Sequence, residues 1–456
     1  MSDPVIVPRA EHTLSRRLVD PEALKVLYRL QQAGFTGYLV GGSVRDLLLG
    51  RKPKDFDIGT SAHPYEVKRL FRNCWIIGRR FRLAHVRFGA KTIEVATFRR
   101  LVPLDEAPAP DTPEAMAAEA AEALAVSAPQ AVAETAEEAL DAARAVDRLL
   151  HRDNSYGTPE QDAFRRDFTI NALFYDIATF SIIDYTGGLA DLRAGLLRSI
   201  GDPMVRFEED PVRMIRAVAF AARLDFTIDQ PIEEAIAAKR DDLARSAPAR
   251  LIEECYKLLR SGSAEKAFRM LAERRLLEPM SAELQAEAGD ALWGSLCTLD
   301  EYRRRFESAP EALTNTILLG ALIVPLGSTG KRILQQQPLN DKGKEPRVEL
   351  GLLPLARRDI DRLRHVLAFQ RRLTDATLSP RARRGLIHRG PFQEAVTWME
   401  LFGKNASLAA EWRDFALEAH PADDADPAAP EEAPPRKRRR RRRRGGRRGS
   451  RPSAPE

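Results

Sequence analysis

The sequence is poor in cysteine and in long apolar runs, and each lack excludes a class of protein. Its 456 residues include three cysteines, Cys74, Cys255 and Cys297, whose wide spacing fits neither a disulfide framework nor a metal site; we expect buried thiols. The longest apolar run, residues 317–326, is too short to span a bilayer and contains Pro325. The first twenty residues hold no apolar block of signal-peptide length. We therefore expect a soluble, cytoplasmic protein without a membrane partner.

Charge is segregated along the chain, although the formal net charge is +6. Residues 101–143 carry ten acidic residues and no Lys or Arg, whereas residues 436–456 carry twelve Lys and Arg and one Glu. Because each phosphate neutralised by Lys or Arg releases counterions, this tail predicts sequence-independent affinity for a polyanion such as a nucleic acid; an acidic protein partner is the alternative. The residues assigned to this RNA-binding tail are Arg436, Lys437, Arg438, Arg439, Arg440, Arg441, Arg442, Arg443 and Arg444.

Hydrophobic spacing divides the chain into a mixed α/β part and a helical part. Residues 20–33 predict an amphipathic helix that stops at Gly34, and short strand-like and helical segments alternate up to about residue 100. Residues 101–147, dominated by Ala, Glu and Pro, predict a mobile insertion. Beyond residue 200 the 3.6-residue period predicts a helical array without a fixed-period repeat.

An acidic pair stands out in KPKDFDIGT, residues 52–60. Asp55 and Asp57 lie one residue apart, so in an extended segment they share a face about 7 Å apart and call for a cation between them. A bare D-x-D is mostly a surface turn or cap, but here the segment GGS, residues 41–43, precedes it at a strand-to-helix junction. Such a junction can hold phosphate oxygens, with Ser43 as the expected N-cap.

A phosphate cradle beside a carboxylate pair implies a hard metal ion, and Mg²⁺ suits oxygen ligands better than zinc does. Glu94 follows in the strand-like segment TIEVATF, flanked by Ile93 and Val95, and is expected on the face opposite these two. Three acids from two strands would suit a two-metal phosphoryl-transfer site. The alternative for Glu94 is an edge-strand acid that faces water.

The segment RRDFTINAL, residues 165–173, supplies further charged and polar groups. Its arginines could neutralise triphosphate charge, and Asp167 could accept a hydrogen bond from a ribose hydroxyl. A structural ion pair is the alternative.

In EDPVRMIRA, residues 209–217, Pro211 marks the first turn of a helix and makes Asp210 a natural N-cap. Asp210 and Arg213 also lie three residues apart on one helical face, which offers an acceptor beside a donor. Such a pair would match adenine and cytosine and disfavour guanine and uracil.

Four segments together, LVGGSVRDLLLGRKPKDFDIGT, IEVATFR, RRDFTINAL and EDPVRMIRA, resemble in order and type the class II nucleotidyltransferases of the DNA polymerase β superfamily. That family includes tRNA CCA-adding enzymes and bacterial poly(A) polymerases. The resemblance covers residues 35–100 and 148–275, and it implies attack of an RNA 3′-hydroxyl on the α-phosphate of ATP with release of pyrophosphate. It implies two Mg²⁺ ions on the catalytic residues Asp55, Asp57 and Glu94. It also implies nucleotide binding by Gly41, Gly42, Ser43, Arg45, Arg166, Asp167, Asn171, Asp210, Arg213 and Arg216.

Residues 74–89, CWIIGRRFRLAHVRFG, resemble the poly(A) polymerase version of this region, which favours polyadenylation as the activity. The expected substrates are the 3′ ends of mRNA, small RNAs or tRNA, and RNA-decay proteins are the expected protein partners. The alternatives are a tRNA nucleotidyltransferase that adds CCA or A, and a non-catalytic RNA-binding protein. Ala219 departs from the family, which often has Arg there.

The expected fold class is α+β, with a polymerase-β-like head followed by an all-α neck, body and tail. The expected divisions are an N-terminal lead and helix (1–35), the head (36–195), a nucleotide- and RNA-binding neck (196–262), an RNA-binding body and tail (263–420), and a disordered acidic and then Arg-rich end (421–456).

Overall fold

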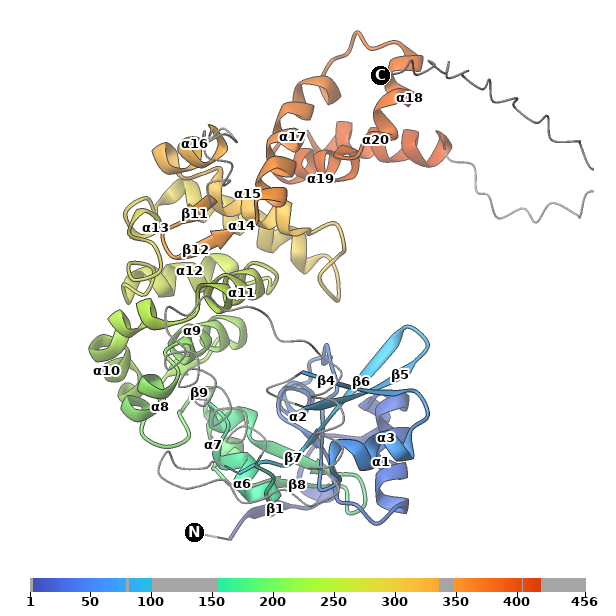
Figure 1. Cartoon of the computed structure of the whole chain (residues 1–456), viewed down its shortest axis with the longest axis vertical. Coiled ribbons are helices and arrows are strands. Elements are labelled where there is room, and N and C mark those ends of the chain that lie inside the picture. Colours follow the sequence, from blue (N-terminus) through green and yellow to red (C-terminus); the bar gives the residue numbers. More distant parts are fainter. Residues whose placement is uncertain (1–2, 79–81, 101–154, 336–347, 404, 420–456) are drawn as a thin grey trace, which may run out of the picture.

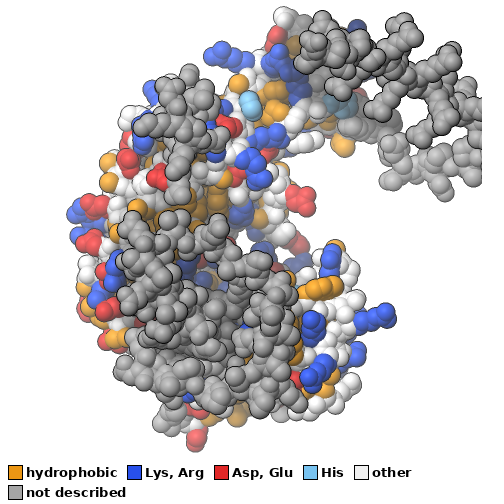
Figure 2. All heavy atoms as spheres, viewed as in Figure 1, with side chains coloured by type: hydrophobic (Ala, Val, Ile, Leu, Met, Phe, Trp, Pro, Cys, Tyr) orange, Lys and Arg blue, Asp and Glu red, His pale blue; other side chains and the backbone are white. Residues whose placement is uncertain are grey.

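The computed structural model describes residues 3–78, 82–100, 155–335, 348–403 and 405–419. The chain forms an open C, with a mixed head at one end and helices stacked away from it toward the other end (Figure 1). The space-filling view shows the hollow of the C between the head and the C-terminal helices (Figure 2). The expected α+β class is confirmed. No helix in the described ranges has both the length and the apolarity needed to cross a membrane.

One eight-stranded sheet forms the centre of the head, in the order β1-β8-β7-β2-β3-β6-β5-β4. The β3–β6 pair is parallel, and the other neighbouring pairs of this sheet are antiparallel. The strands are β1 (Val5–Val7), β2 (Gly37–Val40), β3 (Ile58–Thr60), β4 (Cys74–Ile77), β5 (Leu83–Phe88), β6 (Lys91–Thr97), β7 (Leu173–Asp176) and β8 (Ser181–Asp184).

Helices α1 (Pro21–Gln32) and α3 (Pro64–Leu70) cover the face of the sheet that is lined by Leu39, Ile58 and Val95. Asp20 caps α1 by accepting hydrogen bonds from two backbone N–H groups, and the chain turns after the helix at Gly34, whose φ is +85°. This confirms the helix expected over residues 20–33. We call the face covered by α1 and α3 the back face and the opposite one the front face.

The remaining described helices of the head are α2 (Gly42–Leu48), α6 (Pro159–Phe164) and α7 (Gly188–Ala194), with 3₁₀ turns at Arg9–Glu11, Arg16–Leu18 and Thr169–Asn171. On the front face, Val40, Phe98 and Phe174 form a small separate core, which supports the sheet around the site described below. Gly59 lies under Phe98, and an added Cβ there would come within 2.6 Å of the ring.

The helical array that follows confirms the expectation for the second half of the chain. It comprises α8 (Pro203–Glu209), α9 (Val212–Leu224), α10 (Gln230–Lys239), a 3₁₀ turn (Arg240–Arg245), α11 (Pro248–Leu259), α12 (Ala264–Glu273), α13 (Ala282–Ala286), α14 (Asp290–Arg304), α15 (Asn315–Ile323), α16 (Gly327–Gln335), α17 (Arg357–Leu373), α18 (Pro380–Ile387), α19 (Phe392–Phe402) and α20 (Ala406–Ala419). Two small β pairs interrupt it: β9 (Leu196–Leu197) with β10 (Thr227–Ile228), and the hairpin β11 (Val348–Leu350) with β12 (Leu353–Leu355).

Of the cysteines, Cys74 and Cys255 are buried as expected, and Cys297 is half-buried; all three thiols are free. Burial raises the pKa of the Cys255 thiol to about 12. The Ala/Glu-rich insertion and the Arg-rich end, including Arg436 to Arg444, lie outside the described residues.

Candidate active site

Two of the predicted carboxylates lie on neighbouring strands: Asp57 comes just before β3, and Glu94 lies in the middle of β6. Ile58 of β3 pairs in parallel register with Val95 of β6, and both side chains are buried on the back face. Asp57 and Glu94 each come one residue earlier, so both face the front, and Asp55 precedes Asp57 by two residues. This confirms the orientation predicted for Glu94, opposite Ile93 and Val95.

The electrostatics of Asp57 reflect this crowding. Burial, followed by the negative charges of Glu94 and Asp55, raises the pKa of Asp57 to about 6, and Arg166 acts in the opposite direction. Asp57 is therefore a carboxylate whose ionised form is disfavoured until a cation approaches. The cation expected between Asp55 and Asp57 stays a prediction.

Two oxygen-donor side chains side by side, with a third two residues away, suit a hard cation such as Mg²⁺. Within the described ranges, however, no three His, Cys, Asp or Glu side chains converge closely enough to hold a metal ion. Asp57 and Glu94 thus share one face, while Asp55 lies in the exposed segment before β3, where Lys54 is 3.5 Å from its carboxylate. The donor chemistry of these oxygen ligands fits Mg²⁺.

A glycine turn lies beside these carboxylates. β2 ends at Val40, whose N–H donates to the Asp57 carbonyl, and Gly41 follows with φ +66°. A Cβ on Gly41 would come within 2.7 Å of Arg166 Nη1. The strand-to-helix junction was therefore predicted correctly, and it places backbone N–H groups and a guanidinium next to Asp57.

The predicted N-cap of this junction was wrong. The cap position of α2 is Gly41 rather than Ser43, and no side chain caps the helix. Ser43 lies inside the helix, where its Oγ donates to the carbonyl oxygen of Val40 at 2.9 Å. The positive φ of the glycine starts the helix two residues earlier than the side-chain signal suggested.

Arg166 is held in place from several sides. Its guanidinium bonds Asp162 through Nε and Nη2, at 3.2 and 2.9 Å, and the Asn171 carbonyl through Nη1 at 3.0 Å. The guanidinium carbon also lies 5.4 Å from the centroid of Phe174. Burial alone would raise the pKa of Asp162, but Arg166 and Arg165 bring it below the ordinary value.

The other predicted residues of this region form a largely buried polar chain. Arg45 donates to Asp46 and to the side-chain oxygen of Asn171. Asn171 Nδ2 donates to Asp167 at 3.1 Å, and Asp167 pairs with Arg216 of α9. The site therefore continues from the head into the helical part of the chain.

Asp167 takes the structural role that the sequence left open as an alternative. One carboxylate oxygen accepts from Asn171 and from the Phe168 N–H, and the other accepts from Arg216. Burial would raise the pKa of Asp167, but Arg216 and Asn171 lower it below the ordinary value. Binding of a ribose hydroxyl by Asp167 stays a prediction.

Asp210 and Arg213 lie close in the chain but have other partners. α8 ends at Glu209 and α9 begins at Val212, so Asp210 follows the end of α8, and the cap position of α9 is Pro211 without a side-chain capping bond. The expected N-cap at Asp210 is thus replaced by a single 3.3 Å contact from the Val212 N–H.

The carboxylate of Asp210 accepts two hydrogen bonds from Arg250 of α11, at 3.0 and 2.7 Å. Arg213 donates to Glu209 at 2.9 Å and to the Arg206 carbonyl at 2.8 Å. The two side chains expected to read the base are not paired with each other, and their role stays a prediction.

Sequence reasoning missed the partners that hold these residues. Asp46 pairs with Arg223 at 2.9 Å, and Phe220 lies under both Arg45 and Arg216 at 5.2 and 5.5 Å. Since Arg216, Phe220 and Arg223 are spaced i, i+4 and i+7, helical periodicity already predicts that they share one face of α9. What that face contacts was not readable from the spacing.

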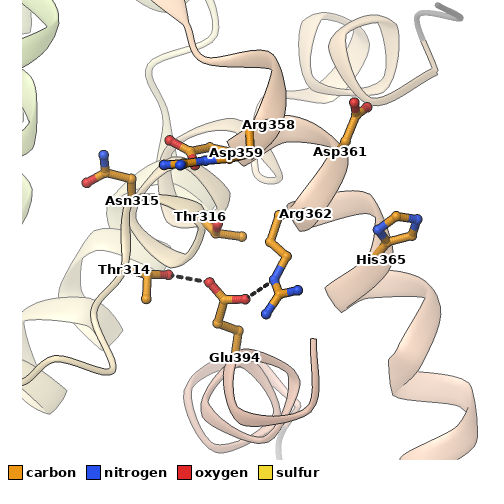
Figure 3. A pocket seen from close by; sticks show the side chains of 9 residues that line it. All are labelled: Thr314, Asn315, Thr316, Arg358, Asp359, Asp361, Arg362, His365 and Glu394. Atoms are coloured by element: carbon orange, nitrogen blue, oxygen red, sulfur yellow. Dashed lines mark hydrogen bonds and ion pairs between the residues drawn. The ribbon is translucent and has the colours of Figure 1, made fainter. Parts of the chain in front are cut away.

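A second hollow lies far along the chain. A cavity of about 600 Å³ opens between the start of α15, α17 and α19 (Figure 3). Glu394 points into it, accepts from Thr314 at 2.8 Å and pairs with Arg362, while Arg358 and Asp359 line the upper wall in this view. Both charge signs line this cavity, and none of the predicted nucleotide-binding residues does.

Comparison with known proteins places these features in context. Residues 37–198 match the family model of the poly A polymerase head domain, and residues 225–287 match that of the probable RNA- and SrmB-binding site of polymerase A. Poly(A) polymerase I of Salmonella typhi is 46% identical over 275 residues, which cover 60% of this chain and 53% of that protein. The CCA-adding enzyme of Lactobacillus helveticus is 34% identical over 257 residues, 56% of this chain and 54% of that protein.

This chain thus spans about half the length of the curated relatives it matches. Among solved structures, the Bacillus stearothermophilus CCA-adding enzyme in complex with CTP is similar over 88% of this chain and 83% of that one. The TM-score is 0.54 at 24% identity, a likeness that concerns the fold alone.

Proposed function

Because the chain carries the head and RNA-binding domains of the poly(A) polymerase family, we propose that it adds adenylate residues to RNA 3′ ends without a template. ATP is the nucleotide donor and pyrophosphate the leaving product. The observation that carries this proposal is that Asp57, just before β3, and Glu94, in the middle of the parallel strand β6, lie on one face of the sheet beside the turn at Gly41.

In this reaction the 3′-hydroxyl oxygen of the RNA attacks the α-phosphorus of ATP, and the bond from that phosphorus to the bridging oxygen of the β-phosphate breaks. Two Mg²⁺ ions on Asp55, Asp57 and Glu94 would favour loss of the hydroxyl proton and offset the charge of the departing pyrophosphate. Arg166 and the N–H groups after Gly41 hold the triphosphate, which keeps the α-phosphorus beside the carboxylates. Arg45 and Asn171 act behind them as positioning residues.

The adenine base lies, in this proposal, toward Asp210 and Arg213 at the junction of α8 and α9. A nucleotide entering there competes with Arg250 for Asp210 and with Glu209 for Arg213. Because both competing pairs are partly exposed, exchanging them for base contacts costs little.

Poly(A) synthesis is favoured over CCA addition by two observations. The poly(A) polymerase I relatives are 41–46% identical to this chain, against 33–34% for the CCA-adding enzymes, over similar lengths. The sequence of residues 74–89 also resembles the poly(A) polymerases more than the CCA-adding enzymes. The proposed substrates are the 3′ ends of mRNA and small RNAs in the cytoplasm.

A primer-extension assay tests this function. The full chain with Mg²⁺ is offered a short oligo(A) RNA or a tRNA lacking its CCA end, with ATP and CTP supplied separately and together. Long ATP-dependent ladders on oligo(A) are expected. One to three additions confined to the tRNA would make the protein a tRNA nucleotidyltransferase instead, and no addition to either RNA would favour a non-catalytic RNA-binding protein.

A further inference from the structure

A row of side chains runs across the front face from the carboxylates to the edge of the sheet. Glu94 of β6 is paired with His85 of β5, and His85 is paired with Trp75 of the edge strand β4. Direct partners on antiparallel strands share a face, so Trp75 lies on the same face as Glu94 and Asp57. His85 fills the step between them, with Nε2 at 3.7 Å from Glu94 Oε1.

The residues at the outer end of this row are large and apolar, yet they are exposed to solvent. Trp75 is 52% exposed, and Ile77, two residues along the same strand, is 50% exposed. Their neighbour Cys74 is buried on the back face, and four residue pairs with β5 fix the strand. Trp75 and Ile77 therefore form a firmly supported apolar surface that the described part of the chain leaves open to solvent.

Cationic charge accompanies this apolar surface. Arg87 alternates with His85 along β5, so it lies on the front face, where its side chain is exposed. Its Nε donates to the Gly89 carbonyl at 2.9 Å, which steadies the side chain beside the row. An exposed indole and an exposed guanidinium on one face of a sheet form a combination that binds single-stranded nucleic acid, with the ring stacked on a base and the cation near a phosphate.

The distance of Trp75 from the carboxylates indicates which part of an RNA could contact it. Three strand spacings separate β3 from β4 and two separate β6 from β4, so Trp75 lies about 14 Å from Asp57 and about 10 Å from Glu94 across the sheet. In Figure 1 the β4–β5–β6 edge lies at the top of the head, next to the opening of the C. A chain whose 3′ end sits at Asp57 and Glu94 has its next nucleotides within reach of this surface.

We propose that Trp75, with Ile77 and Arg87, binds the RNA primer just upstream of its 3′ end by stacking a base on the indole. The proposal rests on the proposed function, because it takes the carboxylates as the place of the 3′-hydroxyl. The interaction is indifferent to base identity, since every base offers a π face. It aligns the last nucleotides of the primer along the row that leads to the carboxylates.

Tryptophan fluorescence tests the stacking without catalysis. Trp75 is far more exposed than the other three tryptophans, Trp293, Trp398 and Trp412, which are 8%, 6% and 1% exposed. Quenching of tryptophan fluorescence by a stacked RNA base is therefore expected to come from Trp75. A short oligo(A) RNA added to the full chain without ATP should quench the wild-type emission. Trp75→Phe should lose this quenching yet keep most of the RNA affinity measured by anisotropy of labelled RNA.

Kinetics then separate binding from chemistry. Trp75→Ala should raise the KM for oligo(A) about five- to tenfold, the lower part of the range for one base stack, and leave the KM for ATP unchanged. Tyr28→Ala is the matched control, because Tyr28 is an exposed aromatic residue (37%) on α1, on the back face. This control should leave both KM values unchanged.

A series of oligo(A) primers with one abasic position each locates the stacked base. One abasic position near the 3′ end should weaken extension by the wild type and have no additional effect on Trp75→Ala. Oligo(A) that saturates the anisotropy signal but leaves the wild-type emission unchanged would overturn the proposal, as would an unchanged primer KM in Trp75→Ala. Absence of any extension by the wild type would overturn the proposed function instead, and the quenching result would still decide whether RNA stacks on Trp75.

Discussion

Gly41 combines two constraints on substitution. Its φ of +66° disfavours any residue with a Cβ, and a Cβ there would also come within 2.7 Å of Arg166 Nη1. Gly50 shares the first constraint, with φ +67°, but has open space around it. Gly41 therefore differs from Gly50 in the approach of Arg166, and its ψ of −126° also lies outside the left-handed helical region.

We expect Gly41→Ala and Gly50→Ala both to lower the free energy of unfolding, and Gly41→Ala to lower it more, because φ +66° with ψ −126° lies outside the left-handed helical region that residues with a Cβ can enter. The atom that meets the new Cβ at position 41 ends a flexible side chain, so it moves away at little further cost. Only Gly41→Ala should raise the KM for ATP, by about tenfold, because Arg166 leaves the Asn171 carbonyl. Urea unfolding and steady-state kinetics check this; equal activity in both variants would remove Arg166 from the triphosphate site.

Asp57 is expected to cost stability in return for activity. Asp57→Asn should reduce nucleotide addition at least about a hundredfold, because a metal ligand is removed. In excess EDTA near neutral pH, the Tm of the Asp57→Asn variant should match or exceed that of the wild type. The reason is that the substitution removes a carboxylate that Glu94 and Asp55 repel. Glu349→Gln, an exposed acid in β11, is the control and should change neither property. A marked drop in the Tm of Asp57→Asn would instead indicate a structural role.

The contribution of Asp162 to the free energy of unfolding is expected to depend on pH. Its pKa is lowered in the folded state by Arg166 and Arg165 against the effect of burial, so its stabilising contribution is complete well above the ordinary value of 3.8 and is lost as pH falls below it. Asp162→Asn should cost about 2 kcal/mol near neutral pH, less than for a fully buried pair because both arginines are partly exposed.

The difference between Asp162→Asn and the wild type should shrink as pH falls below 3.8, which urea unfolding at two pH values measures. Glu160→Gln in the same short helix is the control, since Glu160 has no ion pair within the described ranges. A difference that is constant across pH would contradict the assigned pKa direction.

At the scale of elements, one face of α9 joins the helical part to the head. Arg216 pairs with Asp167, Arg223 with Asp46, and Phe220 lies between them against Arg45 and Arg216. Arg51 of the head also donates to the Arg223 carbonyl at 3.1 Å, at the end of the same helix. The residues that position the nucleotide site thus depend on a helix outside the sheet.

A double-mutant cycle tests this joint. Asp46→Asn, Arg223→Gln and the double variant should reveal a coupling free energy of about 1 kcal/mol, and both single variants should lower kcat/KM for ATP through Arg45. Arg304→Gln serves as the control, because its 4.0 Å pair with Asp300 lies far from α9. A coupling of zero in urea unfolding would mean that the Asp46–Arg223 pair does not hold the site.

How much of this site the sequence predicted depends on the range of each interaction. The orientation of Glu94, opposite Ile93 and Val95, followed from strand alternation, which is local, and the glycine junction followed from residue type, whereas the common face of Asp57 and Glu94 depends on the pairing of β3 with β6. The partners of Asp167 and Asp210, and the row from Glu94 to Trp75, depend on pairings between segments far apart in the chain, which periodicity does not encode. The hairpin β11–β12 was missed because three-residue strands are too short to show alternation, although Gly351, with φ +60°, marks its turn.

At the scale of the whole molecule, the head and the C-terminal helices enclose a hollow with Lys and Arg side chains along its rim (Figure 2). The Arg-rich segment 436–456 would add charge to such a surface. Replacing its twelve Lys and Arg by Gly and Ser should flatten the salt dependence of RNA binding, by roughly 0.7 in the log–log slope for each phosphate that is no longer neutralised.

The rate of nucleotide addition on a saturating primer should stay unchanged in that variant. A shuffled tail with the same twelve charges is the control and should keep the wild-type slope, because the attraction to phosphate does not depend on the order of the residues. The measurement is the RNA affinity of each variant over a range of salt concentrations. If the uncharged variant has the same log–log slope as the wild type, the tail does not bind RNA and has another partner.

The joint at α9 also determines where the molecule can bend. Because the half-buried Arg216–Asp167 pair and the Phe220 packing bind α9 to the head, the head and α9 must travel together as one rigid unit. Farther along, the exposed pair of Lys52 with Glu307 in the loop after α14 links the head to the body and is worth little. We therefore expect any opening or closing of the C around a bound RNA to have its hinge beyond α9, so that the proposed nucleotide site keeps its shape while the far arm moves.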